Sequence, residues 1–306
     1  MSNELKKYLF QDHAARVQAV RLTDAWQDGL VHQHYPECVQ RLLGELVSAA
    51  VLLASNIKFD GSLVLQLQGD GPVALIVVEC NMNLEIRATA SLREGQTVPE
   101  DGTLQSLLNT NGQGRFIVVL DPNRDTTDMQ PYQGIVPLEG DTVAKVLELY
   151  MRSSEQLDTR LWLAANSHCS AGVLLQRLPG LGGNATDASA TEETWQRAVI
   201  LSETLQTDEL LGLESDQLVQ RLFWEEALLT FEPQQVRWHC PCTRDRVSNM
   251  LRMLGPEEIE SILSEREKVD VSCNFCGKPY SFDAIDCASL FTDNFDSGHA
   301  NPSSLH

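Results

Sequence analysis

Two pairs of closely spaced cysteines near the carboxyl end constrain the fold of this chain more than any other feature. One pair, Cys240 and Cys242, lies in RWHCPCTRDR, and the other, Cys273 and Cys276, lies in VSCNFCGKPYSF. A structural zinc site needs four ligands at tetrahedral corners, with Zn–S distances of ~2.3 Å, and a close cysteine pair supplies two corners from one turn. The spacing therefore predicts a four-thiolate zinc site that organises residues 237–290 into a small unit.

The thirty residues between the pairs must bring the chain back to the metal. The segment SNMLRMLGPEEIESILSE is predicted to do so as two short helices that meet at Gly255 and Pro256. A glycine directly after Cys276 suits a tight knuckle. His239 is a possible substitute ligand, but four cysteines already complete the set, so it is interpreted as a surface or packing residue. A thioredoxin-like role for Cys273 and Cys276 would leave the first cysteine pair unexplained.

Other candidate chemical groups favour structural interpretations. Adjacent residues on a strand point apart, so His168 beside Cys169 implies no nucleophile and base. The neighbouring acids Glu225 and Glu226 are interpreted as a solvated face. The four cysteines outside the pairs are interpreted as small buried hydrophobes: Cys38, Cys80, Cys169 and Cys287.

Charge and hydropathy exclude several classes of partner. The chain has 306 residues and a formal charge of −20, which opposes general binding to nucleic acid or anionic lipid. Its amino terminus lacks the pattern of a secretory signal, and its longest weakly polar run, 46–55, is about half of the ~20 residues that a membrane helix needs. We therefore expect a soluble cytoplasmic protein, in which clustered cysteines serve metal binding or redox chemistry rather than a disulfide framework.

Residues 1–180 are predicted to form an α+β core domain. Proline at position 36 and a continuous apolar pattern predict a buried helix over 36–57. A second helix, over 140–157, is predicted to be capped by Asp141. Alternating or continuous apolar runs predict strands, without regular βαβ alternation, in 62–80 (a hairpin turning at Gly-Asp-Gly-Pro), 84–90, 114–121, 132–138, 159–166 and 171–179.

A Gly-, Ser- and Thr-rich stretch around residue 181 predicts a boundary, and a helical pattern follows over 191–232. Residues 181–236 carry eleven acidic residues against two arginines. Amphipathic helices this acidic repel themselves and depend on packing against something else. The segment is therefore either a metastable helical linker or an ordinary helical subdomain. The polar composition of 291–306 predicts a disordered tail.

Metal removal is predicted to unfold the small cysteine-bearing unit. A structural zinc site contributes ~10–16 kcal/mol of apparent binding energy, against the ~5–15 kcal/mol that stabilises a whole domain. Thiolates also react with oxidants, so oxidation would remove ligands and folding energy together. Spacing alone does not distinguish such a switch from a plain structural zinc ribbon.

The segment 240–286 resembles the zinc domain of the thirty-three-kilodalton heat-shock protein family, redox-regulated holdase chaperones of the bacterial cytoplasm. The resemblance extends over nearly the whole chain through IKFDG (57–61), LQLQGDGP (65–72), YQGIVPLEGDT (132–142), YMRSSEQLDTRLWL (150–163) and TDELLGL (207–213), in the order of the family.

The resemblance implies a chaperone that is not an enzyme and works without ATP. In the reduced, monomeric form, Cys240, Cys242, Cys273 and Cys276 would hold one zinc ion. Oxidants would form the disulfides Cys240–Cys242 and Cys273–Cys276, release zinc, unfold the zinc domain and loosen the linker 181–236. The activated protein would dimerise and bind unfolded client proteins, preventing their aggregation under oxidative stress.

Two functions of other classes compete with this one. A zinc ribbon that binds nucleic acid would need a basic surface, but residues 237–290 contain seven Lys or Arg against nine acids. A thiol oxidoreductase would have to turn over substrate disulfides catalytically.

Overall fold

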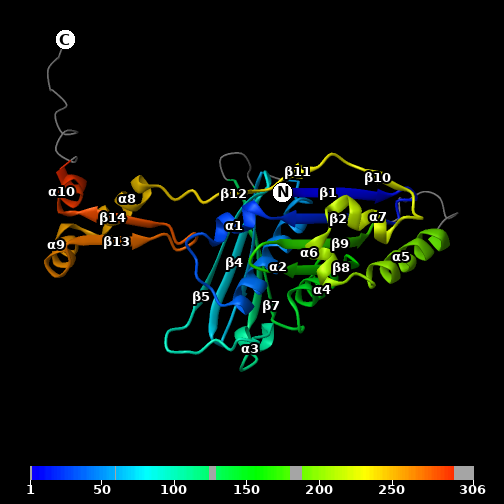
Figure 1. Ribbon diagram of the computed structural model, residues 1–306, viewed down its shortest axis with the longest axis horizontal. Coiled ribbons are helices and arrows are strands. Elements are labelled where there is room, and N and C mark those ends of the chain that lie inside the picture. The colour runs from blue at the N-terminus through cyan, green and yellow to red at the C-terminus, as the bar shows by residue number, and fades with distance from the viewer. Residues whose placement is uncertain (1, 59, 124–128, 180–187, 293–306) are drawn as a thin grey trace, which may run out of the picture. The chain divides into compact units, whose positions relative to one another are not determined.

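The structure, a computed structural model, describes residues 2–58, 60–123, 129–179 and 188–292 (Figure 1). The chain forms two compact units, one ending at His239 and the other beginning at Cys240. Both units mix helices with mainly antiparallel sheets, which confirms the predicted α+β class. The boundary predicted near residue 181 lies outside the described residues.

The first sheet of the amino-terminal unit is antiparallel throughout its described strands. Its order is β10-β1-β2-β9-β8, and β11 also pairs with β1. The first 22 residues supply two of its four long strands, β1 and β2, which no apolar pattern predicted. The strands are β1 (Asn3–Phe10), β2 (Ala15–Leu22), β8 (Thr159–Ala165), β9 (Ser170–Arg177), β10 (Leu228–Thr230) and β11 (Gln234–Gln235).

The second sheet has the order β12-β5-β4-β3-β6-β7. The predicted hairpin is confirmed, because β3 and β4 pair across the turn at 69–72, and the three strands predicted after it are also present. Among the strands in the described ranges, only β12 runs parallel to its neighbour, β5. The strands are β3 (Gly61–Gln68), β4 (Val73–Asn81), β5 (Glu85–Leu92), β6 (Arg115–Pro122), β7 (Tyr132–Pro137) and β12 (Arg237–Trp238).

Helix α2 (Glu37–Ala54) lies between the two sheets and confirms the predicted buried helix (Figure 1). Its apolar residues point to all sides because it packs on β2, β8 and β9 on one side and on β3, β4 and β5 on the other. Gly44 permits this close approach, since a Cβ there would come within 2.4 Å of the Cβ of Ala165. The main core of the unit surrounds this helix.

Three further helices complete the core: α1 (Asp24–Leu30), α3 (Leu104–Leu108) and α4 (Val143–Ser153). The cap predicted for α4 was wrong by one residue. Thr142 has extended backbone angles and its side-chain oxygen accepts the N–H of Lys145, so Thr142 rather than Asp141 satisfies the free donors of the first turn.

Helices α5 (Ala188–Ser202), α6 (Thr207–Gly212) and α7 (Ser215–Leu222) pack on the face of the first sheet opposite α2. Side chains alternate along each strand, so Val20 of β2 enters the main core, whereas Val17 and Ala19 face these helices. Both faces of the sheet are therefore apolar, and the acidic segment covers one of them.

The helical pattern predicted over 191–232 was wrong at its end. Residues 228–230 form β10, which pairs with β1 from Tyr8 to Phe10. The free edge of β1 offers backbone hydrogen bonds that a solvent-exposed helical turn would not replace. This tertiary contact therefore outweighs the helical spacing of the apolar residues in the sequence.

The carboxyl-terminal unit consists of α8 (Arg244–Leu254), α9 (Pro256–Glu265), the hairpin β13 (Lys268–Ser272) and β14 (Pro279–Asp283), and α10 (Ala284–Thr292). The two helices predicted around Gly255 and Pro256 are confirmed. Helix α10 continues two residues past the predicted end of the unit at 290, and the rest of the predicted tail lies outside the described residues. Eight buried residues form its core, namely Val247, Leu251, Ile259, Val269, Tyr280, Phe282, Cys287 and Leu290.

Candidate metal centre

The second cysteine pair lies on the turn that joins β13 to β14. The N–H of Cys273 donates to the carbonyl of Lys278 at 3.0 Å, and the N–H of Gly277 donates to the carbonyl of Cys273 at 2.8 Å. Gly277 has φ +69°, a left-handed conformation that glycine adopts without steric cost. The predicted knuckle is therefore present, and it aims both thiols to one side of the turn.

The first pair lies on the segment that precedes α8, and side chains hold its backbone. The hydroxyl of Tyr280 donates to the carbonyl of Cys242, and a guanidinium nitrogen of Arg246 donates to the carbonyl of Pro241, each at 3.0 Å. Thr243 caps α8 by accepting the N–H of Arg246. Two of the three carbonyls of the C-x-C segment thus have side-chain partners, which hold the backbone that carries its thiols.

The four sulfur atoms form one compact cluster. Sγ of Cys240 lies 3.7 Å from Sγ of Cys273, Sγ of Cys242 lies 3.4 Å from Sγ of Cys276, and all four lie within 4.8 Å of one another. A tetrahedron with Zn–S distances of ~2.3 Å has edges of about 3.8 Å between its sulfur atoms. The donor set and its spacing fit a zinc ion. Within the described ranges, this is the only group of metal-ligating side chains of its kind.

The thiols differ in how readily they lose their protons. Burial opposes ionisation of Cys242, but hydrogen bonds, with Tyr280 the largest contributor, lower its pKa to about 7. Burial raises the pKa values of the Cys240 and Cys276 thiols. Because metal ligands must be thiolates, binding of a metal ion would release protons from this cluster.

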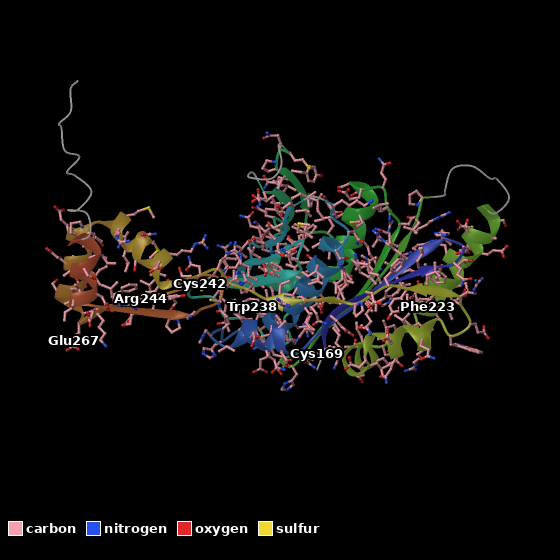
Figure 2. All side chains as sticks on the ribbon, turned by 90° about the horizontal axis from the view of Figure 1, so that it is seen from above. Cys169, Phe223, Trp238, Cys242, Arg244 and Glu267 are labelled. Carbon is pink, nitrogen blue, oxygen red and sulfur yellow. The ribbon has the colours of Figure 1, made fainter. Side chains whose placement is uncertain are left out.

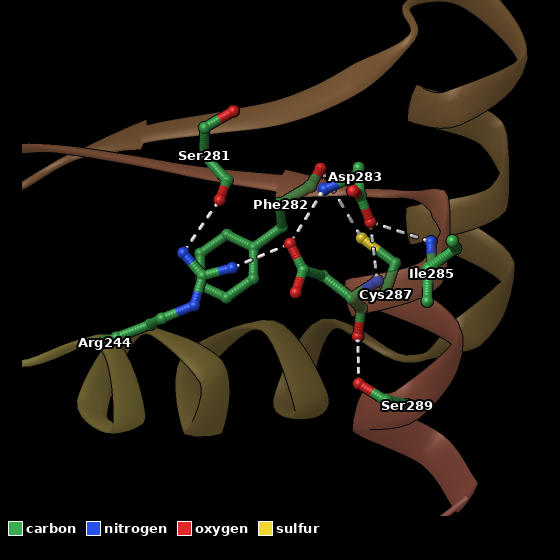
Figure 3. Close-up of polar contacts among 8 residues, drawn as sticks. Arg244, Ser281, Phe282, Asp283, Ile285, Cys287 and Ser289 are labelled. Carbon is green, nitrogen blue, oxygen red and sulfur yellow. Dashed lines mark hydrogen bonds and ion pairs between the residues drawn. The ribbon is translucent and has the colours of Figure 1, made fainter.

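A polar network supports the hairpin that carries the second pair (Figure 3). The guanidinium of Arg244 lies 4.1 Å from the centre of the Phe282 ring and donates to the carbonyl of Ser281 and the carboxylate of Asp286, at 2.9 and 2.7 Å. A carboxylate oxygen of Asp283 accepts the N–H groups of Ile285 and Asp286 at the start of α10. Side chains outside the thiol cluster therefore join β14 to α8 and α10.

Most other candidate residues lie where the sequence placed them. His239 and His168 are exposed. Cys169 lies in the amino-terminal unit, whereas Cys242 and Arg244 lie in the carboxyl-terminal unit (Figure 2). The cysteines outside the pairs are buried, with exposures of 1% for Cys38, 0% for Cys80, 4% for Cys169 and 2% for Cys287.

The structure agrees with the sequence in disfavouring the thioredoxin-like interpretation, because Cys273 and Cys276 lie in a hairpin turn, not between a strand and a following helix. One prediction was wrong. Glu226 was wrongly placed on a solvated face: its side chain is 13% exposed, and its carboxylate accepts two hydrogen bonds from Arg197, at 2.5 and 3.1 Å.

Sequence reasoning missed the residues that hold the site. Tyr280, Arg244 and Arg246 lie 38, 2 and 4 residues from Cys242, at spacings that no metal motif specifies. Their contacts arise from the hairpin and from the capped start of α8, so only the folded unit reveals them.

Comparison with known proteins gives a consistent result. The family described as Hsp33 protein matches residues 3–283. The chain is 44% identical over 293 residues to the 33 kDa chaperonin of Methylobacillus flagellatus, covering 95% of each chain. It is 38% identical over 309 residues to that of Vibrio cholerae, covering 100% of this chain and 99% of the relative. A crystal structure of the 33 kDa chaperonin from Thermotoga maritima shares the fold, with a TM-score of 0.76, 20% identity, and coverage of 96% of this chain and 99% of that one.

The fold, the thiol cluster and the similar proteins together place this protein among the chaperones rather than the enzymes. The chain belongs to the Hsp33 family. Among the described residues, no helix is long and apolar enough to cross a membrane.

Proposed function

We propose that this chaperone is an ATP-independent holdase that oxidation switches on. In the reduced state, Cys240, Cys242, Cys273 and Cys276 bind one zinc ion. Each pair then gives two electrons to a peroxide, which is reduced to water while one S–S bond forms, as Cys240–Cys242 or Cys273–Cys276. Zinc leaves because its thiolate ligands have been consumed.

The observation that carries this proposal is the convergence of four thiols in a unit with a very small core. Among the described residues, the apolar core of the carboxyl-terminal unit contains eight buried side chains. Small domains of this size commonly depend on a metal or on disulfides. Loss of zinc would remove ~10–16 kcal/mol of apparent binding energy. The unit therefore unfolds when its thiols are oxidised.

The apolar face beneath α5, α6 and α7 supports the second step of the proposal. Leu210, Leu218 and Phe223 of the acidic segment, exposed by 5%, 3% and 2%, cover Val17 and Val173 of the first sheet. Undocking of the linker 181–236 would expose apolar surface on both partners, and large exposed apolar surface binds other apolar chains. We assign this surface to unfolded client proteins.

The same surface supports the proposal that the reduced monomer forms dimers on activation, because two uncovered apolar faces can also bury each other. A reducing compartment such as the bacterial cytoplasm would keep the zinc-bound state as the resting form. The charge of −20 disfavours nucleic acid and anionic membranes as partners.

The test compares zinc content, free thiols and suppression of client aggregation before and after peroxide at moderately raised temperature. We expect loss of one zinc ion and four thiols per chain, a rise in suppression, and a shift from monomer to dimer in sedimentation. Zinc loss without increased suppression would contradict the proposal.

The matched variants are Cys273→Ser and Cys38→Ser, which change one thiol each. Cys273→Ser removes a ligand, so we expect weakened zinc binding and a carboxyl-terminal unit that unfolds without oxidant. Cys38 lies in the core of the amino-terminal unit, and its replacement should preserve the zinc content and the response to peroxide. Equal responses of the two variants would show that thiol number, not the metal centre, controls activity.

A further inference from the structure

The linker covers one edge of β1 along its length. One edge of this strand pairs with β2, and among the strands in the described ranges the other edge pairs only with β10 and β11. Residues 8–10 lie opposite residues 228–230, and residues 4–5 lie opposite residues 234–235. β10 has three residues and β11 has two, whereas β1 has eight. A long strand edge is therefore covered by two short strands of the segment that activation releases.

Backbone groups at alternate residues of β1 make this contact. The N–H of Phe231 donates to the carbonyl of Lys7 at 3.0 Å. An antiparallel ladder repeats this geometry at every second residue, so the register also makes Leu9 and Leu229 a hydrogen-bonded pair. The peptide groups of Lys7 and Leu9 thus face the linker. Tyr8 lies between them and directs its peptide group to β2.

The contact depends little on the side chains of the linker strand. Leu228 packs against the apolar cluster beneath α5, α6 and α7. Leu229 and Phe231, by contrast, are 43% and 50% exposed, and Thr230 is also exposed. Backbone hydrogen bonds do not depend on the sequence of the strand that makes them. The edge of β1 therefore suits an extended chain of almost any sequence that offers an apolar residue at the position of Leu228.

Release of the linker would leave this edge unpaired. The pairing of β1 with β2, from Asn3 to Leu9, does not involve the linker and would keep β1 in the sheet. The unpaired edge would lie beside Tyr8 and Phe10, which are 5% and 2% exposed while the linker covers them. A regular strand edge beside uncovered apolar side chains is a template for pairing with another extended chain.

We propose that the edge of β1 uncovered by oxidation binds an extended segment of the unfolded client protein as an added antiparallel strand. This inference rests on the proposed function, because the linker must first leave. The partner is defined by its chemistry: it has unpaired backbone N–H and C=O groups and an apolar residue at alternate positions. A folded protein has already paired its backbone groups. The edge therefore selects unfolded chains without recognising a particular sequence.

Hydrogen exchange at single amides tests the proposal in the full-length protein, with carboxymethylated α-lactalbumin as an unfolded client. The amides of Lys7 and Leu9 should be protected in the reduced protein and should exchange about tenfold faster or more after peroxide. They should regain protection when the client is added. The amide of Tyr8, which faces β2, is the internal control and should stay protected throughout. Bound client with the amides of Lys7 and Leu9 still unprotected would overturn the proposal.

Peptides with the sequence of residues 225–236 are matched probes that need no variant protein. One peptide carries N-methyl groups at Leu229 and Phe231, whose N–H groups face β1, and the other carries them at Leu228 and Thr230, whose N–H groups face away. Fluorescence anisotropy would measure their binding to the oxidised protein at millimolar concentration, comparable with the effective concentration of a tethered segment. We expect about tenfold weaker binding of the first peptide, because it lacks two backbone donors. Equal binding of the two peptides would contradict the proposal.

A second copy of the chain is the other occupant that this edge permits, because two β1 strands can pair with each other. In that case, the amides of Lys7 and Leu9 would regain protection when the oxidised protein dimerises, before any client is added. That result would refute a role of the edge in client binding.

These readouts separate the edge from the proposed function. If the oxidised protein suppresses aggregation while the amides of Lys7 and Leu9 stay unprotected with client bound, only the role of the edge fails. If the edge binds the peptides after oxidation but aggregation of clients is not suppressed, only the proposed function fails.

Discussion

Tyr280 shows how one side chain can serve both the core and the metal centre. Its ring is buried in the small carboxyl-terminal core, and its hydroxyl holds the carbonyl of Cys242 at 3.0 Å. Replacement by phenylalanine keeps the ring but leaves that carbonyl without this donor. We expect Tyr280→Phe to destabilise the metal-bound unit by about 1 kcal/mol, and a competition titration with a zinc chelator would measure it as roughly fivefold weaker binding.

The control for Tyr280→Phe is Tyr132→Phe, which removes a hydroxyl from a tyrosine on β7 in the other unit. Equal zinc affinities for the two variants would show that the hydroxyl of Tyr280 does not support the C-x-C segment.

Asp216 of α7 connects the linker to β1 by two hydrogen bonds. Its carboxylate accepts from Lys6 Nζ at 2.5 Å and from the Tyr8 hydroxyl at 2.6 Å, and these bonds, that of Lys6 first, lower its pKa. A carboxyl group whose pKa is lowered by docking stabilises the docked state at pH above its ordinary pKa of 3.8. This stabilisation is lost as the pH falls through the lowered pKa of the docked state. Acid below the ordinary value of 3.8 therefore weakens docking here.

Asp216→Ala should ease release of α7. The side chain of Asp216 is 60% exposed, so its ion pair with Lys6 contributes little, but the buried Tyr8 hydroxyl loses its acceptor. We expect a cost of roughly 1–3 kcal/mol, seen as faster hydrogen exchange of residues 215–222 at pH 7. The exposed acid Asp208 provides the control, and faster exchange after Asp208→Ala as well would indicate a general charge effect instead.

Docking of helix α7 on the first sheet depends on Phe223, the residue that follows the helix. Phe223 is 2% exposed and meets Phe10 of β1 edge to face, with ring centres 5.4 Å apart. Truncation of a buried phenylalanine costs about 3–5 kcal/mol. Phe223→Ala is therefore expected to release the linker in the reduced protein and raise suppression of client aggregation without loss of zinc.

Trp224→Ala gives a stringent comparison, since Trp224 is the next residue but is 75% exposed. Trp224→Ala removes a larger apolar side chain than Phe223→Ala, but it leaves the contact between the linker and the first sheet intact. If both variants activate the chaperone equally, docking of Phe223 does not control activity.

The elements also show how far the sequence determines the fold. Strand β3 was predictable because its apolar residues alternate, and β6 and α2 were predictable because they are continuous apolar runs of the length of a buried strand and a buried helix. The short strands β10, β11 and β12 were not, because two or three residues carry no period and form only where β1 and β5 offer free edges. The four ligands of the metal centre were predictable from spacing, whereas Tyr280, Arg244 and Arg246 depend on tertiary contacts.

For the whole molecule, the two units should respond differently to metal removal. The amino-terminal unit has a large core around α2 that uses none of the four clustered thiols, whereas the other unit has a small core that two of them, Cys242 and Cys273, border. A chelator with a reducing agent should unfold residues 240–292 and leave the two sheets intact. Peptide-resolved hydrogen exchange would show this, and full protection of 268–283 without metal would contradict it.

The place where the chain leaves the second sheet has a mechanical consequence. Arg237 and His239 donate to the carbonyls of Leu84 and Ile86, and the next residue along the chain is Cys240. No residue separates His239, which makes the last of these hydrogen bonds, from Cys240. A force on Cys240 therefore acts directly on β12, a strand of two residues. The backbone hydrogen bonds of such a strand break one after another, beginning at the end next to Cys240. The amide of His239 should be the first to lose its protection when the thiols react.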